Sequence, residues 1–222
     1  MQQYLVSETN VELYISNIRA AYYQALQYPS LVEEGLNWYA IAHEKAYAMA
    51  HRLNDASIFE VCGVIAALSP NNRWERNLVD AETLFRHAIN GGKLDNIRVS
   101  TYAQNKEKAW LICRGVADPL DVIRGNKTKS FYQCLIAPDK SDAVCVDSHA
   151  VNIALGRQAS IARTPALTDN KYALIAFCYT TATREINEDS VCGSVLPLQV
   201  QALTWTYYRV MRGLDARFSI QS

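Results

Sequence analysis

The chain has 222 residues, half of them apolar, so it can bury a core as one domain or as two small lobes. Its 22 Lys and Arg balance 22 Asp and Glu, and this neutral total excludes a strong overall field for a polyanion. The start lacks a signal peptide's basic region and apolar core, and no apolar run approaches the roughly 18 residues of a membrane span. We therefore expect an intracellular, cytoplasmic monomer with no membrane partner.

The first two expected helices are defined by apolar residues at helical spacing. They cover residues 10–27 and 31–53, with a break at Pro29-Ser30. His43 and His51 in the second helix are eight residues apart, which does not suit a metal pair, so we expect no metal site.

The third expected helix, residues 58–68, is apolar all round and follows Ser57 as its N-cap. A helix that is apolar on every face is buried, so this one should be the central core helix. It ends at a Ser-Pro-Asn-Asn turn, residues 69–72, and another helix is expected over residues 74–88.

Six cysteines are scattered along the chain with no Cys-x-x-Cys pair. Most lie inside apolar helix faces, so we interpret them as small buried hydrophobic residues in a reducing compartment. They are Cys62, Cys113, Cys134, Cys145, Cys178 and Cys192.

The middle of the chain contains two helix starts that carry candidate reactive groups. A helix over residues 100–115 and a short one from Asp118 lead to the turn pair Gly125-Asn126, after which Lys127 should lie in the first turn of a helix ending at Ile136. A second turn and an apolar step then lead to Asp147, the expected N-cap of a helix that ends at Gly156. The lysine and the carboxylate could thus meet from neighbouring helix starts.

The last two expected helices cover residues 169–186 and 198–211. In the second of these, Gln201, Trp205 and Arg209 share one face because they are spaced by four. No strand-like alternation of any length appears. We therefore predict an all-α, two-lobed helical fold with a helix-hairpin-helix element and a cleft between the lobes.

The order and spacing of two motifs resemble a known family. Gly125-Asn126-Lys127-Thr128 is followed, twenty residues after the lysine, by the aspartate of Val146-Asp147-Ser148-His149. This is similar to the helix-hairpin-helix (HhH-GPD) DNA glycosylase superfamily, in its endonuclease III and mismatch adenine glycosylase group. There, a Pro-Gly-x-Gly-x-Lys-Thr-Ala hairpin precedes Val-Asp-Thr-His by a similar distance. The resemblance implies a glycosylase-like domain over residues 57–222, with 1–56 as an added N-terminal layer, or one continuous two-lobed unit.

The chain departs from the family pattern at three places. Ile123 replaces the first hairpin glycine and Arg124 the central apolar residue, so backbone binding of phosphate is expected to differ and Arg124 to contact phosphate itself. The four clustered cysteines that hold an iron–sulfur cluster in some relatives do not follow Cys192. We therefore expect no cofactor.

The resemblance assigns catalytic roles to Asp147 and Lys127. Breaking an N-glycosidic bond builds positive charge on the sugar, which a carboxylate near C1′ stabilises. In bifunctional relatives a lysine attacks C1′ and forms a Schiff base. The ordinary alternatives are that Asp147 is only a structural cap and that Lys127 is a solvated surface charge.

The expected partner is DNA. Residues 98–163 carry ten Lys and Arg against six Asp and Glu, although a solvated surface would give the same bias. The segment Leu68-Ser69-Pro70-Asn71 resembles the family's duplex-wedging loop, although an ordinary Pro-Asn-Asn turn explains it as well. The expected DNA contacts are Asn71, Asn72, Arg73, Arg124, Gly125, Asn126, Thr128 and Lys129. The expected walls of a pocket for an extruded base are Trp110, Phe131, Tyr132 and Trp205.

Three functions follow from these motifs. The first is a DNA base-excision glycosylase acting on a modified or damaged base, with or without AP-lyase activity. The second is a phage-type enzyme of thymine hypermodification on the same fold, which would act in the host cytoplasm. The third is a catalytically silent DNA-binding module.

Overall fold

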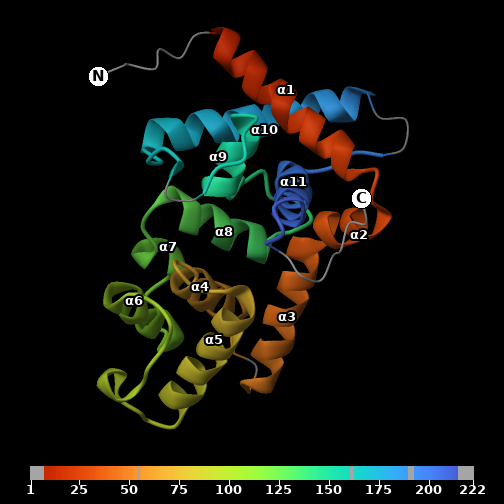
Figure 1. The fold of residues 1–222 in the computed structure, drawn as a ribbon. Helices are drawn as coiled ribbons and strands as arrows, with labels where there is room; N and C mark the ends of the chain where they lie inside the picture. Colours follow the sequence, from red (N-terminus) through yellow and green to blue (C-terminus); the bar gives the residue numbers. More distant parts are fainter. Residues whose placement is uncertain (1–7, 55, 161–162, 190–192, 215–222) are drawn as a thin grey trace. The chain divides into compact units, whose positions relative to one another are not determined.

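The protein is all-α, as the sequence predicts. The computed structural model describes residues 8–54, 56–160, 163–189 and 193–214. Within these ranges the chain forms α-helices α1 to α11 and one short 3-10 helix, and no strand (Figure 1). None of these helices combines the length and the apolar character that crossing a lipid bilayer requires.

The chain divides into two compact units. Unit 1 comprises Met1–Tyr39 and Asp139–Ser222, and unit 2 comprises Ala40–Pro138. The first two helices pack with C-terminal helices in unit 1, and the expected boundary between residues 56 and 57 stays a prediction. The predicted cleft between lobes stays a prediction, and each unit is described by itself.

Unit 1 is built around its last helix. It contains α1 (Glu8–Ala25), α2 (Pro29–Leu36), α9 (Ser148–Ala154), α10 (Asp169–Asp189) and α11 (Pro197–Met211). Helix α11 packs against all four others, and α1 also packs on α9 and α10 (Figure 1). The face that α11 turns to its neighbours includes Val200 and Leu203, both fully buried. This burial of apolar area is the main stabilising contribution in the unit.

Unit 2 is built around α4. It contains most of α3 (Trp38–Arg52), then α4 (Ile58–Leu68), α5 (Trp74–Ile89), the 3-10 helix η1 (Leu94–Asn96), α6 (Ala103–Cys113), α7 (Pro119–Val122) and α8 (Asn126–Ile136). Helix α4 packs against α5, α6, α7 and α8 (Figure 1). Every residue from Val61 to Leu68 is buried, which confirms the predicted central core helix. A Cβ atom at Gly63 would lie 2.6 Å from Pro119 Cγ, so the glycine lets α7 approach α4 closely.

Three local expectations are wrong. The helix expected over residues 31–53 is two helices, because α2 ends at Leu36 and α3 begins at Trp38. The break follows Gly35, a poor helix former, whose Cα faces Leu203 so closely that an added Cβ would lie 2.7 Å from the Leu203 Cα. The first helix starts at Glu8, before the expected cap at residue 10. Ser57 does precede α4, but its hydroxyl makes no capping hydrogen bond.

The cysteines behave as small core residues where the structure describes them. Cys62, Cys134, Cys145 and Cys178 are buried, and Cys113 is half-buried. Burial raises the pKa of the Cys62 thiol to about 12, so this group stays protonated and unreactive at neutral pH. Cys192 lies outside the described residues.

Candidate functional site

Asp147 caps α9, as the sequence predicts. Its Oδ1 atom accepts hydrogen bonds from the backbone N–H groups of His149 and Ala150, both at 2.9 Å. Two of the N–H groups that a helix start leaves without a helical partner are satisfied in this way. The carboxylate therefore lies at the positive end of α9, where its negative charge is stabilised.

The second oxygen of the same carboxylate is held by the last helix. Asp147 Oδ2 accepts a hydrogen bond of 3.0 Å from the indole N–H of Trp205 in α11. The carboxylate thus receives N–H donors from two helices, which fixes its orientation. Asp147 and Trp205 were predicted as a catalytic group and a pocket wall from separate motifs, and the structure brings them together.

The backbone that leads into Asp147 is held by hydrogen bonds to a tyrosine of α10. Tyr172 of α10 donates a hydrogen bond of 2.7 Å to the carbonyl of Val144, and its hydroxyl accepts one of 3.3 Å from the N–H of Val146. Val144 and Val146 are buried, so apolar burial and this tyrosine together place the start of α9.

The buried Tyr179 phenol lies in the core of unit 1. Burial raises the pKa of the Tyr179 phenol well above its usual value, and the negative charge of Asp147 raises it further. The Tyr179 hydroxyl lies 3.4 Å from the hydroxyl of Thr204, the residue before Trp205. Tyr179 therefore contributes no charge of its own beside the carboxylate.

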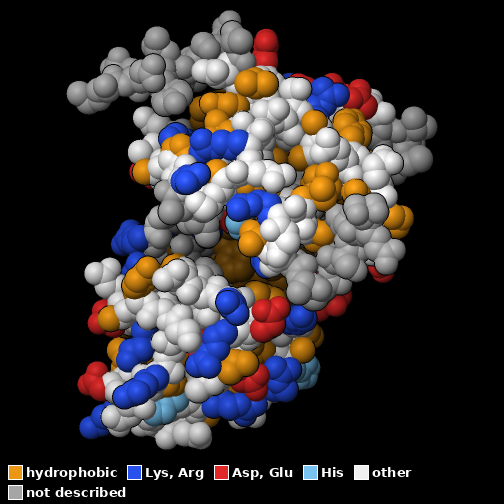
Figure 2. Space-filling model, in the orientation of Figure 1, with side chains coloured by type: hydrophobic (Ala, Val, Ile, Leu, Met, Phe, Trp, Pro, Cys, Tyr) orange, Lys and Arg blue, Asp and Glu red, His pale blue; other side chains and the backbone are white. Residues whose placement is uncertain are grey.

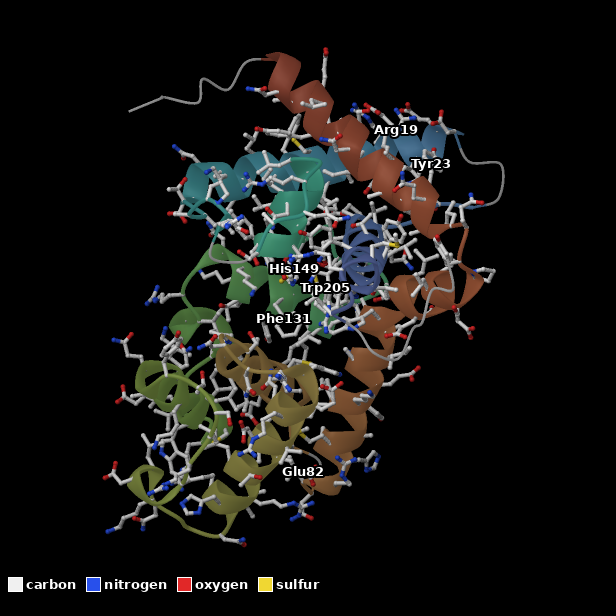
Figure 3. All side chains as sticks on the ribbon, viewed as in Figure 1. Arg19, Tyr23, Glu82, Phe131, His149 and Trp205 are labelled. Carbon is white, nitrogen blue, oxygen red and sulfur yellow. The ribbon has the colours of Figure 1, made fainter. Side chains whose placement is uncertain are left out.

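Aromatic rings cluster around Trp205, the ring that contacts the carboxylate. The Trp205 ring meets Trp38 edge-on at 6.4 Å between centroids, and His149 at 6.2 Å. His149 in turn lies 5.3 Å from the ring of Tyr208, and Figure 3 shows His149 and Trp205 next to each other. Arg209 places its guanidinium carbon 4.4 Å from the Trp205 ring centroid, a cation–π contact. Trp205 is half-buried, so part of this aromatic surface is open to a ligand.

Sequence reasoning missed most of these rings. Trp38, His149 and Tyr208 were not among the pocket residues, although His149 follows Asp147 by two residues and Tyr208 follows Trp205 by three. One signal was present: Trp205 and Arg209 were predicted to share a face of the last helix. The cation–π contact between them confirms that prediction.

The predicted hairpin lies in unit 2, between α7 and α8. Asp118 caps α7 by accepting a hydrogen bond of 2.8 Å from the N–H of Leu120. Ile123 has φ −68° and is 1% exposed, so the residue that replaces the family's first glycine has ordinary backbone geometry and a buried side chain. The positive φ of the turn, 84°, falls on Gly125, where a glycine is retained.

The polar side of this hairpin faces solvent. Arg124, Gly125, Asn126 and Lys127 are exposed, while Thr128 and Lys129 are half-buried. Helix α8 begins at Asn126, so Lys127 lies in its first turn as predicted. Lys127 belongs to unit 2 and Asp147 to unit 1, and their action on one nucleotide stays a prediction.

The predicted wedge loop is held by side-chain hydrogen bonds of Asn71 and Asn72. Asn71 has φ 62°, is exposed, and donates a hydrogen bond of 3.3 Å to the Tyr102 hydroxyl. Asn72 instead turns inward and donates to Asp80 Oδ2 at 3.1 Å. Arg73 is exposed at the start of α5. Asn71 and Arg73 are therefore the loop side chains available to a partner.

The anchor of this loop is Asp80, which sequence reasoning did not single out. Asp80 is 1% exposed, and besides the Asn72 amide it accepts hydrogen bonds from Arg76 Nε and from the backbone N–H of Ser100, both at 2.8 Å. A buried carboxylate with several donors stabilises the structure that those donors belong to. It thereby joins the loop to the segment before α6.

The other predicted pocket walls lie in unit 2. Phe131 and Tyr132 are buried, Phe131 against Trp74 at 6.5 Å between ring centroids. Burial raises the pKa of Tyr132 to about 12. Trp110 contacts His87 and Arg114 and lines a surface hollow whose other residues lie in 92–94 and 111–116, none of them in the hairpin.

Charge is distributed unevenly between the units. Unit 2 carries thirteen Lys and Arg against ten Asp and Glu, and Figure 2 shows many of these basic side chains on one face of it. Unit 1 carries nine against twelve. Among the described residues, no three or more His, Cys, Asp or Glu side chains gather as metal ligands would.

A protein-family model matches residues 1–212, nearly the whole chain. The chain belongs to this family, DUF7178. It is described as a family of unknown function. Comparison with curated proteins and with solved structures gives no match.

The contact between Asp147 and Trp205 can be measured as a coupling energy. Trp205→Phe removes the indole N–H and keeps an aromatic ring beneath Arg209. We expect it to cost about 1.5–3 kcal/mol of unfolding free energy when Asp147 is present, because a hydrogen bond to a charged group is lost. In the Asp147→Ala background the cost should be clearly smaller. Urea unfolding of the four proteins followed by circular dichroism gives the coupling, and equal costs in both backgrounds would contradict it.

Proposed function

We propose that this protein is a DNA base-excision glycosylase that cleaves the N-glycosidic bond of a modified or damaged base, with AP-lyase activity through Lys127. The observation that carries the proposal is the Asp147 carboxylate, held by donors from α9 and α11 beside a half-buried aromatic surface. As proposed, the enzyme acts as a cytoplasmic monomer, in the host cell if a phage encodes it.

The chemistry requires a fixed anion near the sugar. When the C1′–N bond breaks, its electron pair leaves with the base, which takes up a proton, and positive charge develops at C1′ and the ring oxygen. A carboxylate already oriented by N–H donors stabilises that charge without reorganising during the reaction. Asp147 has this character, and a structural cap alone would not need the additional Trp205 donor.

The aromatic rings that cluster at Trp205 could stack with a base that has left the DNA helix. An enzyme acting on a base must take it out of the helix, which costs a few kcal/mol that stacking on aromatic side chains offsets. Trp205 offers such a surface directly beside the carboxylate, and Trp38 and His149 extend it. This grouping supports a nucleobase as the substrate.

Lys127 has the second proposed role. Its amine adds to C1′ as the base leaves, and loss of a proton and opening of the sugar ring give a Schiff base, from which the 3′ phosphate can be eliminated. The support is its place in the first turn of α8 after Gly125, together with the resemblance of the hairpin motif. Arg124, Gly125, Asn126, Thr128 and Lys129 would contact the DNA backbone around it, and Asn71 and Arg73 would reach the duplex from their loop.

Asp147→Asn tests the carboxylate. Asparagine caps helices about as well as aspartate, so α9 should form, although the amide group now facing the Trp205 N–H should cost about 1–3 kcal/mol of stability. Base release, measured per folded molecule, should fall on the order of a hundredfold or more because the charge is lost. Asp118→Asn, the same change at the N-cap of α7, is the matched control and should keep its activity. Full activity in Asp147→Asn would make Asp147 structural only.

Borohydride trapping tests the lysine. Borohydride added during turnover should reduce the Schiff base and join the protein covalently to DNA. Lys127→Ala should abolish this adduct, and Lys127→Arg should not restore it because a guanidinium is not a free amine. Lys129→Ala should still form the adduct. Base release with no adduct would mean that water attacks C1′, and an adduct that maps to Lys129 would show that the motif is read two residues out of register.

A further inference from the structure

The arginines that the structure describes in unit 1 fall into two groups. Arg19 forms ion pairs with Glu185 at 2.9 Å and Asp189 at 2.6 Å, and Arg184 lies 3.9 Å from Glu188. The second group comes from the segment that follows α9 and from the end of α11. In the described part of the chain no carboxylate forms an ion pair with any of its members, which are Arg157, Arg163, Arg209 and Arg212.

A buried asparagine assembles one end of this second group. The Asn152 side chain, 0% exposed, donates hydrogen bonds to the Ala159 carbonyl and to the Thr164 hydroxyl, and accepts one of 3.1 Å from Arg157 Nε. Arg157 also donates to the carbonyl of Arg163 at 3.4 Å. These hydrogen bonds link residues 157–160 with residues 163–164 in a loop region that carries two arginines.

The same loop is joined to α11. Arg212 Nη1 donates a hydrogen bond of 2.6 Å to the Ala159 carbonyl, and the Tyr208 hydroxyl lies 3.3 Å from the Ala159 nitrogen, whose N–H it accepts. An arginine has five N–H donors, so Arg157 and Arg212 retain donors for a ligand after making these contacts. The loop arginines and the α11 arginines therefore form one surface.

Each of two cations on α11 lies beside an aromatic ring of the same helix. Trp205, Tyr208, Arg209 and Arg212 are spaced by three and four, so they share one face of the helix. Arg209 covers the Trp205 ring and Arg212 lies 5.7 Å from the Tyr208 ring, with His149 against both rings. The stripe extends about 10 Å along the helix axis from Trp205 to Arg212, and its two cations, Arg209 and Arg212, are about 4.5 Å apart along that axis.

The missing carboxylates are not explained by composition. Unit 1 has more acidic than basic residues, and two of its arginines do have acidic partners. Like charges held close together repel one another, so a group of arginines without carboxylates is unfavourable until an anion binds. An anionic ligand would offset this repulsion.

We propose that this surface, the α9–α11 face, binds successive phosphodiester groups of a nucleic-acid strand. The face consists of His149, Arg157, Arg163, Trp205, Tyr208, Arg209 and Arg212. Arginine matches phosphate oxygens with paired donors, and a basic stripe interleaved with aromatic rings is typical of single-strand binding. The inference deepens the proposed function, on which it rests: a strand held here passes Asp147, because Trp205 contacts both the carboxylate and the stripe.

Salt dependence of binding tests this proposal. The full-length protein is titrated with a fluorescent single-stranded oligonucleotide between 50 and 200 mM salt, and log K is plotted against log salt concentration. Each lost phosphate contact should make the slope shallower by about 0.7. We expect about 0.7 for Arg163→Gln, which uses only its backbone carbonyl in the hydrogen bond with Arg157, and about 1.4 for Arg209→Gln with Arg212→Gln. Arg184→Gln removes an exposed arginine of the same unit and should leave the slope unchanged.

The outcomes separate this inference from the glycosylase proposal. Base release with equal slopes in wild type and all arginine variants overturns the α9–α11 face and leaves the glycosylase intact. Shallower slopes without any base release support the face and overturn the glycosylase. Binding of inorganic phosphate that the arginine variants lose, with no oligonucleotide binding, assigns the surface to a small phosphate ligand and overturns the strand proposal. Thermal unfolding of each variant confirms that it is folded.

Discussion

The hydrogen bond between the Asp147 carboxylate and the Trp205 indole is the contact on which the α9–α11 face depends. It joins the first turn of α9 to the middle of α11, the helix around which the unit is packed. Because Asp147 Oδ1 is already used by α9, the second oxygen can accept from Trp205 only if both helices keep their positions. The same indole supports Arg209, so one side chain links the carboxylate to the cationic stripe.

The hairpin of unit 2 has backbone geometry that fits the residues at each position. An isoleucine at position 123 fits because the backbone there has a negative φ and the side chain enters the core, while the positive φ falls on Gly125. Gly63 contributes from α4 by allowing Pro119 to pack closely, which places α7 before the turn. The turn thus presents Arg124 and Lys127 on the surface of unit 2.

Local features were predictable from sequence, and contacts between distant segments were not. The apolar run from Val61 to Leu68 identified the core helix, and Asp147 was identified as an N-cap, because both depend on neighbouring residues. The close approach of Gly35 to Leu203, far along the chain, was missed because it depends on how α2 packs against α11. The Trp205 donor to Asp147 was missed for the same reason, as was the anchoring of the 69–73 loop by Asp80. Such contacts depend on how helices pack, which periodicity and capping do not determine.

Cleavage of the N-glycosidic bond between base and sugar is tested most directly by the products of the wild-type reaction. The protein is incubated with DNA that carries assorted modified and damaged purines and pyrimidines, and mass spectrometry is applied both to the free bases in solution and to the nucleosides that remain in the strand. The account predicts a free base that accumulates with time, with a matching loss of one nucleoside from the DNA. No free base, together with a covalent change to a base still attached to its sugar, would contradict it and assign the chain to base modification instead.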